Sequence, residues 1–171
     1  MITAIQTGLK RLDLTERRIA ELLDETQWAK DFSWNQLINL SGYFKVYRAA
    51  KGAELFHEGQ IEHSLGILIS GEIAIVKNAL QQKETVLARL RAGQTFGEMS
   101  LIDDEPRSAT AVAVSDVTFL FISLEEFIRL GKEKAPLGFA LLWKISRQIS
   151  QRLRRTSGQL VEHLSGTMPD E

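Results

Sequence analysis

The chain of 171 residues contains no cysteine and only three prolines. Without cysteine it can form neither a disulfide bond nor a thiolate centre, which fits a protein of a reducing compartment. No apolar run approaches the roughly 20 residues that a membrane-spanning helix needs, and the N-terminus lacks the apolar core of a signal peptide. We therefore expect a cytoplasmic protein that binds no membrane.

An excess of charge of either sign is also lacking. The chain carries 21 lysines and arginines against 22 aspartates and glutamates, so its formal net charge is -1. No overall field therefore recruits nucleic acid or an anionic surface. The hydrophobic content of 44% and the charged content of 25% are ordinary for a globular domain with a real core.

Patterns typical of an enzyme or a metal centre are lacking too. His57 and His63 do not have the HxH-plus-Glu spacing of metal sites on comparable β-folds. Asp103, Asp104 and Glu105 are consecutive, so their side chains diverge and form no clear acid–base pair. We expect no metal and no catalytic activity.

Short β-rich runs punctuated by glycine fill the middle of the chain, between Phe44 and Ile122. Their spacing is typical of an antiparallel sandwich or barrel. Strands are predicted over residues 43–48, 53–57, 65–69, 72–77, 84–90, 108–114 and 117–122.

Helical patterns precede the β-rich region. Apolar residues at helical spacing predict a helix within residues 9–30, with Thr15 as a cap, and a second helix over 34–40. The two helices are interpreted as a packing appendage, with a partner-binding role as the alternative.

Helical patterns also follow the β-rich region. Ser123 and Glu126 form a capping box that opens a helix, and Gly131 is expected to end it. Pro136 marks the start of a longer helix that reaches about His163.

Together these patterns predict an α+β fold. We expect an antiparallel β-roll or jelly-roll sandwich of about eight strands, with N-terminal helices and a long C-terminal helix. The expected division is a helical appendage over residues 1–40, the β-roll over 41–131, and the C-terminal helix and tail over 132–171. Within that tail, residues 166–171 are expected to fray.

The segment FGEMSLIDDEPRSATAV, residues 96–112, has the composition of an anion site. Gly97 lets the backbone approach a ligand, and a helical turn over residues 98–102 offers free N–H groups. The guanidinium of Arg107 suits two phosphate oxygens. The alternative is an acidic surface loop whose arginine pairs with a neighbouring carboxylate, Asp103, Asp104 or Glu105.

This segment resembles the phosphate-binding cassette of the cyclic nucleotide-binding domain family. The residues in register are Phe96, Gly97, Glu98, Leu101, Pro106, Arg107, Ser108, Ala109 and Thr110. The stretch LFHEGQIEHSLGILISGEIAIV is similar to the first half of the same domain. One departure is Gly66, where the family usually carries a bulky residue, and we expect looser packing there.

The resemblance implies a set of ligand-binding residues. Arg107 would pair with the cyclic phosphate, and Glu98 would accept a hydrogen bond from the ribose 2′-hydroxyl. Backbone N–H groups would complete the cradle. The implied set within the cassette is Gly97, Glu98, Met99, Arg107, Ser108 and Ala109.

The long C-terminal helix carries a mostly apolar heptad pattern. The pattern predicts a homodimer held by paired helices, and the alternative is a stripe that packs on its own β-domain. Its members are Leu142, Ser146, Ile149, Leu153, Thr156, Leu160 and His163.

Within this helix, ISRQISQRLRRTSGQL resembles the dimer helix of bacterial catabolite activator proteins. That resemblance implies that Thr156 and Ser157 contact an adenine, with Arg152 near the phosphate and ribose. The alternative is an ordinary Thr-Ser pair on a solvated face. Gly158 departs from the pattern and is expected to bend or end the helix.

These features predict a non-enzymatic sensor of cyclic AMP. No helix-turn-helix follows, so we expect no sequence-specific DNA binding and an output through an unknown effector protein. Cyclic GMP remains possible, because the Ser108 hydroxyl beside Arg107 could favour guanine. A further alternative is a partner-binding module of the same fold that has lost its ligand.

Overall fold

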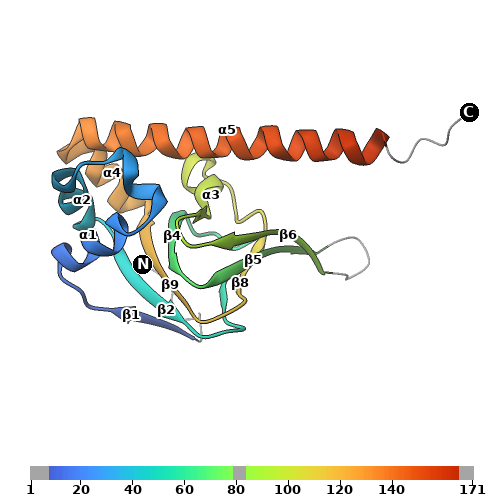
Figure 1. Ribbon diagram of the computed structural model, residues 1–171, viewed down its shortest axis with the longest axis horizontal. Coiled ribbons are helices and arrows are strands. Elements are labelled where there is room, and N and C mark those ends of the chain that lie inside the picture. Colours follow the sequence, from blue (N-terminus) through green and yellow to red (C-terminus); the bar gives the residue numbers. More distant parts are fainter. Residues whose placement is uncertain (1–7, 79–83, 166–171) are drawn as a thin grey trace, which may run out of the picture.

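The computed structural model describes residues 8–78 and 84–165. The chain forms two antiparallel sheets, flanked by short helices and crossed by one long helix (Figure 1). The expected frayed tail, residues 166–171, lies outside the described residues. Helices span α1 (Glu16–Asp24), α2 (Trp34–Ser41), α3 (Glu98–Asp103), α4 (Leu124–Glu133) and α5 (Ala135–Ser165), with a 3-10 turn η1 (Gln27–Asp31).

The strands confirm the predicted roll. One sheet has the order β1-β2-β9-β4-β7 and the other the order β3-β8-β5-β6. The described residues hold nine strands, of which β1 and β7 lie outside the predicted ranges; the two-residue β7 has no pattern to reveal it. The bounds are β1 (Leu9–Leu12), β2 (Lys45–Ala49), β3 (Glu54–Phe56), β4 (Ser64–Ser70), β5 (Glu72–Asn78), β6 (Glu84–Arg91), β7 (Thr95–Phe96), β8 (Thr110–Ala113) and β9 (Val117–Ser123).

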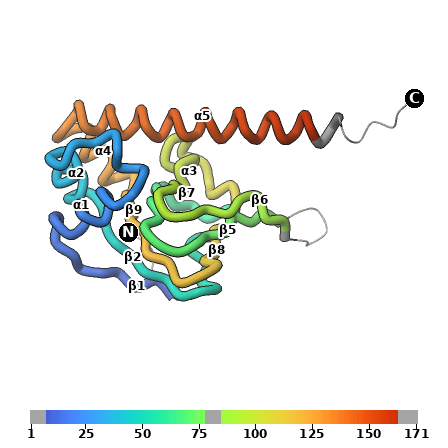
Figure 2. Tube along the Cα trace, viewed as in Figure 1, coloured from blue at the N-terminus to red at the C-terminus, as the bar shows by residue number. Residues whose placement is uncertain are grey.

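Two hydrophobic clusters hold these layers together. One lies between the sheets and is rich in aromatic side chains, with Phe96, Phe119 and Phe121 in contact. The other lies between the five-stranded sheet and the helices, where Leu141 and Ile145 of α5 are fully buried. The N-terminal half of α5 is thus anchored in the core, while the rest runs on past α3 (Figures 1 and 2).

The predicted helix over residues 9–30 is wrong at its start. Residues 9–12 form β1, which pairs with β2 at the sheet edge, because this long-range pairing overrides the local apolar spacing. The helix proper begins after Thr15, whose hydroxyl accepts from the Arg18 N–H at 3.3 Å, as predicted.

Two glycines behave differently from expectation. Gly131 does not end α4, which continues to Glu133. A Cβ at Gly138 of α5 would lie 2.8 Å from the Gly131 Cα, so the two glycines permit close helix packing there. Gly158 does not end α5 either, since the helix runs on to Ser165.

The expected loose packing at Gly66 is also wrong. The ring of Phe96, which is buried, lies where a side chain at Gly66 would project. β7 pairs with β4 at this point, with Gly66 opposite Phe96. An aromatic residue from the other strand therefore fills the space.

Candidate functional site

The cassette is a sharply folded connection between the two sheets. β7 ends at Phe96, and Gly97, whose φ of 72° is left-handed, follows it and caps the start of α3. A Cβ at Gly97 would overlap the Arg107 guanidinium and lie 2.9 Å from the Ser64 carbonyl oxygen. Glycine is thus required both by the backbone conformation and by the space.

Arg107 points into the protein and is 3% exposed. Its Nη1 donates to the Ser64 carbonyl at 2.8 Å, the Gly97 carbonyl at 2.9 Å and the Ser100 hydroxyl at 2.7 Å. Its Nη2 donates to the Ser64 hydroxyl, and the guanidinium lies 4.1 Å from the centre of the Phe56 ring. These contacts hold one end of the guanidinium in a fixed position.

The alternative interpretation, a surface loop with a salt-bridged arginine, is wrong. Among the described residues, no ion pair joins Arg107 to Asp103, Asp104 or Glu105, which are all exposed. Asp104 instead lies 3.4 Å from the Nε2 of His63. Burial lowers the pKa of Arg107 to about 10, although the negative charges of neighbouring glutamates oppose that shift.

Glu98 is the second buried charge of the cassette, and it too is 3% exposed. One of its carboxylate oxygens, Oε1, accepts from Nη1 of Arg152, which reaches over from α5. Arg152 also donates through Nη2 to the Thr95 carbonyl at 3.0 Å. Burial raises the pKa of Glu98, while the positive charges of Arg152 and Arg107 act against the rise.

Each of these two buried side chains keeps one polar atom without a partner in the part of the chain described. On Arg107 it is the Nε donor, and on Glu98 it is the Oε2 acceptor. A buried polar atom without a hydrogen bond costs about 1–3 kcal/mol. The site therefore offers an unused donor on a cation and an unused acceptor on an anion.

The remaining predicted site residues are more exposed. Met99 and Ser108 lie at the surface, and the Ser108 hydroxyl faces the Met99 sulfur at 3.8 Å. Ala109 is buried. Thr156 and Ser157 are exposed on α5, and neither side chain forms a hydrogen bond with another described residue. The structure thus brings Arg152 to the cassette but leaves the Thr-Ser pair uncontacted.

Ser64 and Ser100 are parts of the site that the sequence did not reveal. Both are buried, and their hydroxyls hold Arg107. Ser64 precedes the cassette by more than thirty residues, so no local pattern links it to the arginine. Ser100 lies inside the cassette, where a small polar residue at the helical turn was the available signal.

The sequence model of the cyclic nucleotide-binding domain matches residues 46–134. A cyclic AMP receptor protein of Thermus thermophilus is 32% identical over 118 residues, which are 69% of this chain and 53% of the relative. A cAMP-dependent protein kinase regulatory subunit of Hypocrea atroviridis is 33% identical over 67% of this chain and 24% of its own.

Two solved structures are also similar to this chain. A cyclic nucleotide-binding domain from Methylobacillus flagellatus KT superposes with a TM-score of 0.83 and 25% identity, covering 99% of this chain and 95% of that one. The catabolite activator protein of Thermus thermophilus gives a TM-score of 0.70 and 29% identity, over 81% and 62% of the two chains.

The chain belongs to the cyclic nucleotide-binding domain family. It is a regulatory-type domain similar to those of cyclic AMP receptor proteins and protein kinase regulatory subunits. It spans about half the length of the Thermus receptor and a quarter of the Hypocrea subunit. None of the helices that the structure describes is long and apolar enough to cross a membrane.

Proposed function

We propose that the chain is a non-enzymatic regulatory domain that binds cyclic AMP at the cassette. The observation that carries the proposal is the pair of unpartnered buried atoms, Arg107 Nε and Glu98 Oε2. A cyclic phosphate oxygen is an acceptor for the first, and a ribose hydroxyl is a donor for the second. One nucleotide would satisfy both.

The role of Arg107 in this proposal is to neutralise the phosphate through the free edge of its guanidinium. Its Nη1 end is already held by Ser64 and Ser100, so little side-chain freedom remains to be lost on binding. Backbone groups of Gly97, Ser108 and Ala109 would complete the phosphate cradle. Met99 would lie at the rim, where it is half exposed.

Arg152 would connect the ligand to α5. It already bridges Glu98 and the Thr95 carbonyl, so a ribose bound at Glu98 would lie directly beside it. Thr156 is one helical turn further along and Ser157 is next to it, and we propose that they meet the adenine. Since the nucleotide would contact both the roll and α5, binding would favour conformations in which the two are docked.

The measurement that tests this function is calorimetric titration of the whole chain with cyclic AMP and, separately, with cyclic GMP. We expect saturable one-site binding of cyclic AMP, with cyclic GMP weaker because Thr156 and Ser157 favour adenine. Cyclic GMP binding at least as tightly would make the chain a cyclic GMP regulator instead. Absence of heat with either nucleotide would favour the alternative of a partner-binding module without ligand.

We further propose that α5 joins two copies of the chain. The alternative, a stripe that packs on its own β-domain, holds for Ile149, which packs against the core, but not for Leu153 and Leu160, which are 65% and 59% exposed. The buried side of α5 is instead the face with Leu141 and Ile145. An exposed apolar stripe at heptad spacing suits a second helix of the same kind. The receiver of the signal would be a separate effector protein.

The dimer is tested by sedimentation of the full chain at micromolar concentration. We expect the wild type to sediment as a dimer and Leu153→Glu to sediment as a monomer, since a charge would enter the helix seam. Gln151→Glu, an exposed position on the opposite side of the same helix, is the matched control and should stay dimeric. A wild-type monomer, with and without nucleotide, would refute the dimer.

A further inference from the structure

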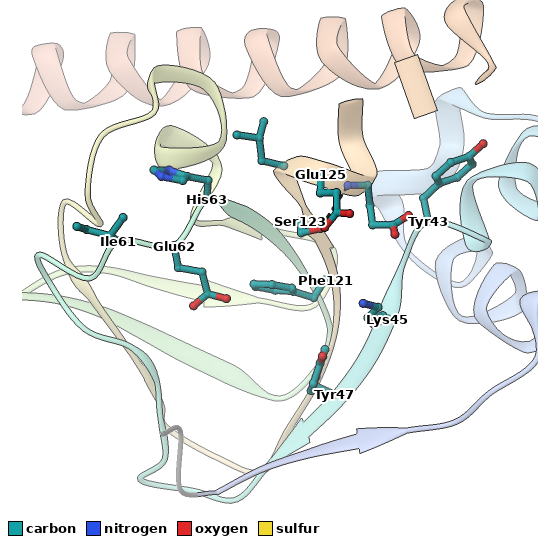
Figure 3. A pocket seen from close by; sticks show the side chains of 11 residues that line it. Tyr43, Lys45, Tyr47, Ile61, Glu62, His63, Phe121, Ser123 and Glu125 are labelled. Atoms are coloured by element: carbon teal, nitrogen blue, oxygen red, sulfur yellow. Dashed lines mark hydrogen bonds between the residues drawn. The ribbon is translucent and has the colours of Figure 1, made fainter. Parts of the chain in front are cut away.

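A cavity opens beside strands β2 and β9, and the cassette residues Glu98 and Arg107 do not line it (Figure 3). Its volume is about 350 Å³, at the lower end of the range for small-molecule sites. We call it the roll-mouth pocket. Its walls come from β2, β9, the start of α4 and the loop before β4, and include Lys45, Tyr47, Glu62, Phe121, Ser123 and Glu125.

Two buried aromatic rings form the inner wall of the roll-mouth pocket. Tyr47 and Phe121 belong to the neighbouring strands β2 and β9. Their ring centres are 6.0 Å apart and the planes meet at 79°. Both residues are buried in the core between the sheets, so their positions are fixed. Such rings can bind an apolar group or, over a ring face, a cation.

Glu62 brings a carboxylate to these rings. It is half-buried, and Figure 3 shows its carboxyl group directed toward the ring of Phe121. One oxygen accepts from the Gln60 side-chain amide at 2.7 Å. Burial is the main cause that raises the pKa of Glu62, because the site withholds water from the ionised form. A cation in the pocket would compensate for that loss of water.

The other charges of the pocket are mostly acidic. Glu126 pairs with Arg129 at 2.8 Å, and Glu125 is exposed at the start of α4. Lys45 is the one opposing ammonium group among the lining residues. Within residues 8–78 and 84–165, no ion pair engages Lys45, Glu62 or Glu125. Among the lining residues, the pocket therefore offers two carboxylates outside ion pairs against one such ammonium, while the positive charge of Arg107 also acts on Glu62.

We propose that the roll-mouth pocket binds a small organic cation, an amine or guanidinium carried on a compact apolar or aromatic body. The body would lie against Tyr47 and Phe121, and the charged group would face Glu62, with Glu125 at the entrance. Lys45 opposes the cation and limits its affinity. The proposal does not rest on the proposed function: neither Glu98 nor Arg107 lines the pocket, although the positive charge of Arg107 acts on Glu62.

The experiment compares three probes that share a phenyl ring: phenethylamine, phenethyl alcohol and 3-phenylpropionate. Each is titrated into the isotope-labelled chain of 171 residues, and amide shifts are followed by NMR. We expect phenethylamine to shift residues of β2, β9 and the loop before β4, and the anionic probe to leave them unchanged. The neutral alcohol should bind more weakly than the amine.

Two substitutions with opposite expected effects sharpen the test. Glu62→Gln removes the carboxylate charge without a change of shape and should weaken phenethylamine binding about tenfold. Lys45→Gln removes the opposing charge and should strengthen it. Glu25→Gln, an exposed carboxylate elsewhere on the surface, is the matched control and should change nothing.

The nucleotide site supplies the last control. Thr156→Ala, an uncharged change on α5 outside the lining of the pocket, should leave phenethylamine binding unchanged, so failure of one site is distinguishable from failure of the other. Equal binding of the amine and the anion would overturn the proposal, as would unchanged affinity in Glu62→Gln. Absence of shifts in the pocket with phenethylamine would overturn it as well.

Discussion

Replacing Arg107 with alanine is expected to remove about 2–5 kcal/mol of the binding free energy for cyclic AMP, because the phosphate would lose its only buried cationic partner in the cassette. Calorimetry on the wild type and the variant measures the loss directly. Because the side chain also holds Ser64 and Ser100, thermal unfolding is measured beside it, to show that the variant is folded at the titration temperature.

Two further variants separate the phosphate contact from the general effect of losing an arginine. Arg107→Lys retains the charge but loses the planar fork, and it should recover only part of the affinity. Arg89→Ala removes an exposed arginine paired with Glu72 at 2.9 Å and should bind as the wild type does. Unchanged affinity in Arg107→Ala would contradict the role given to this residue.

The second large effect concerns the ribose. Wild-type protein should bind 2′-deoxy cyclic AMP more weakly than cyclic AMP by about 1.5–3 kcal/mol, the range for a hydrogen bond to a charged group. In Glu98→Gln this difference should shrink to about 1 kcal/mol or less, because a neutral amide oxygen is the weaker acceptor. Calorimetric titration of both ligands into both proteins gives the four affinities.

Glu105→Gln is the matched control for that comparison, since Glu105 is an exposed carboxylate in the same cassette. It should discriminate between the two ligands as the wild type does. If Glu98→Gln preserved the full preference for the 2′-hydroxyl, the ribose would have to be held elsewhere. Arg152, already in contact with Glu98, would then be the first residue to examine.

Local signals accounted for much of the fold. Thr15 caps α1 and Ser123 accepts from the Glu126 N–H at 3.3 Å to cap α4, because a cap depends only on residues three positions apart. The glycine-separated strands were recognisable because their pattern, too, lies within short segments of the sequence. β1 was missed, since four residues acquire strand structure only by pairing with β2. The prediction that Gly131 ends α4 was wrong because this glycine instead permits close contact with Gly138 of α5.

The candidate site likewise has one part that the sequence predicts and another that only the fold brings together. The register of Gly97, Glu98 and Arg107 could be read from one continuous segment. Their surroundings could not, because Phe56 and Ser64 reach Arg107 from strands distant in the sequence. The contact of Arg152 with Glu98 joins α5 to the cassette across more than fifty residues. The resemblance placed Arg152 near the ligand, but only the fold shows its carboxylate partner.

By itself the sequence determined which chemical groups the cassette contains, and in what order, because short-range spacing sets the turn at Gly97 and the helical turn after it. Only the tertiary structure decided how they are used. It buries Arg107 and Glu98, engages one end of each and leaves Arg107 Nε and Glu98 Oε2 without partners among the residues described. Burial makes those two atoms costly to leave unpaired, and burial is a property of the packed chain rather than of any segment.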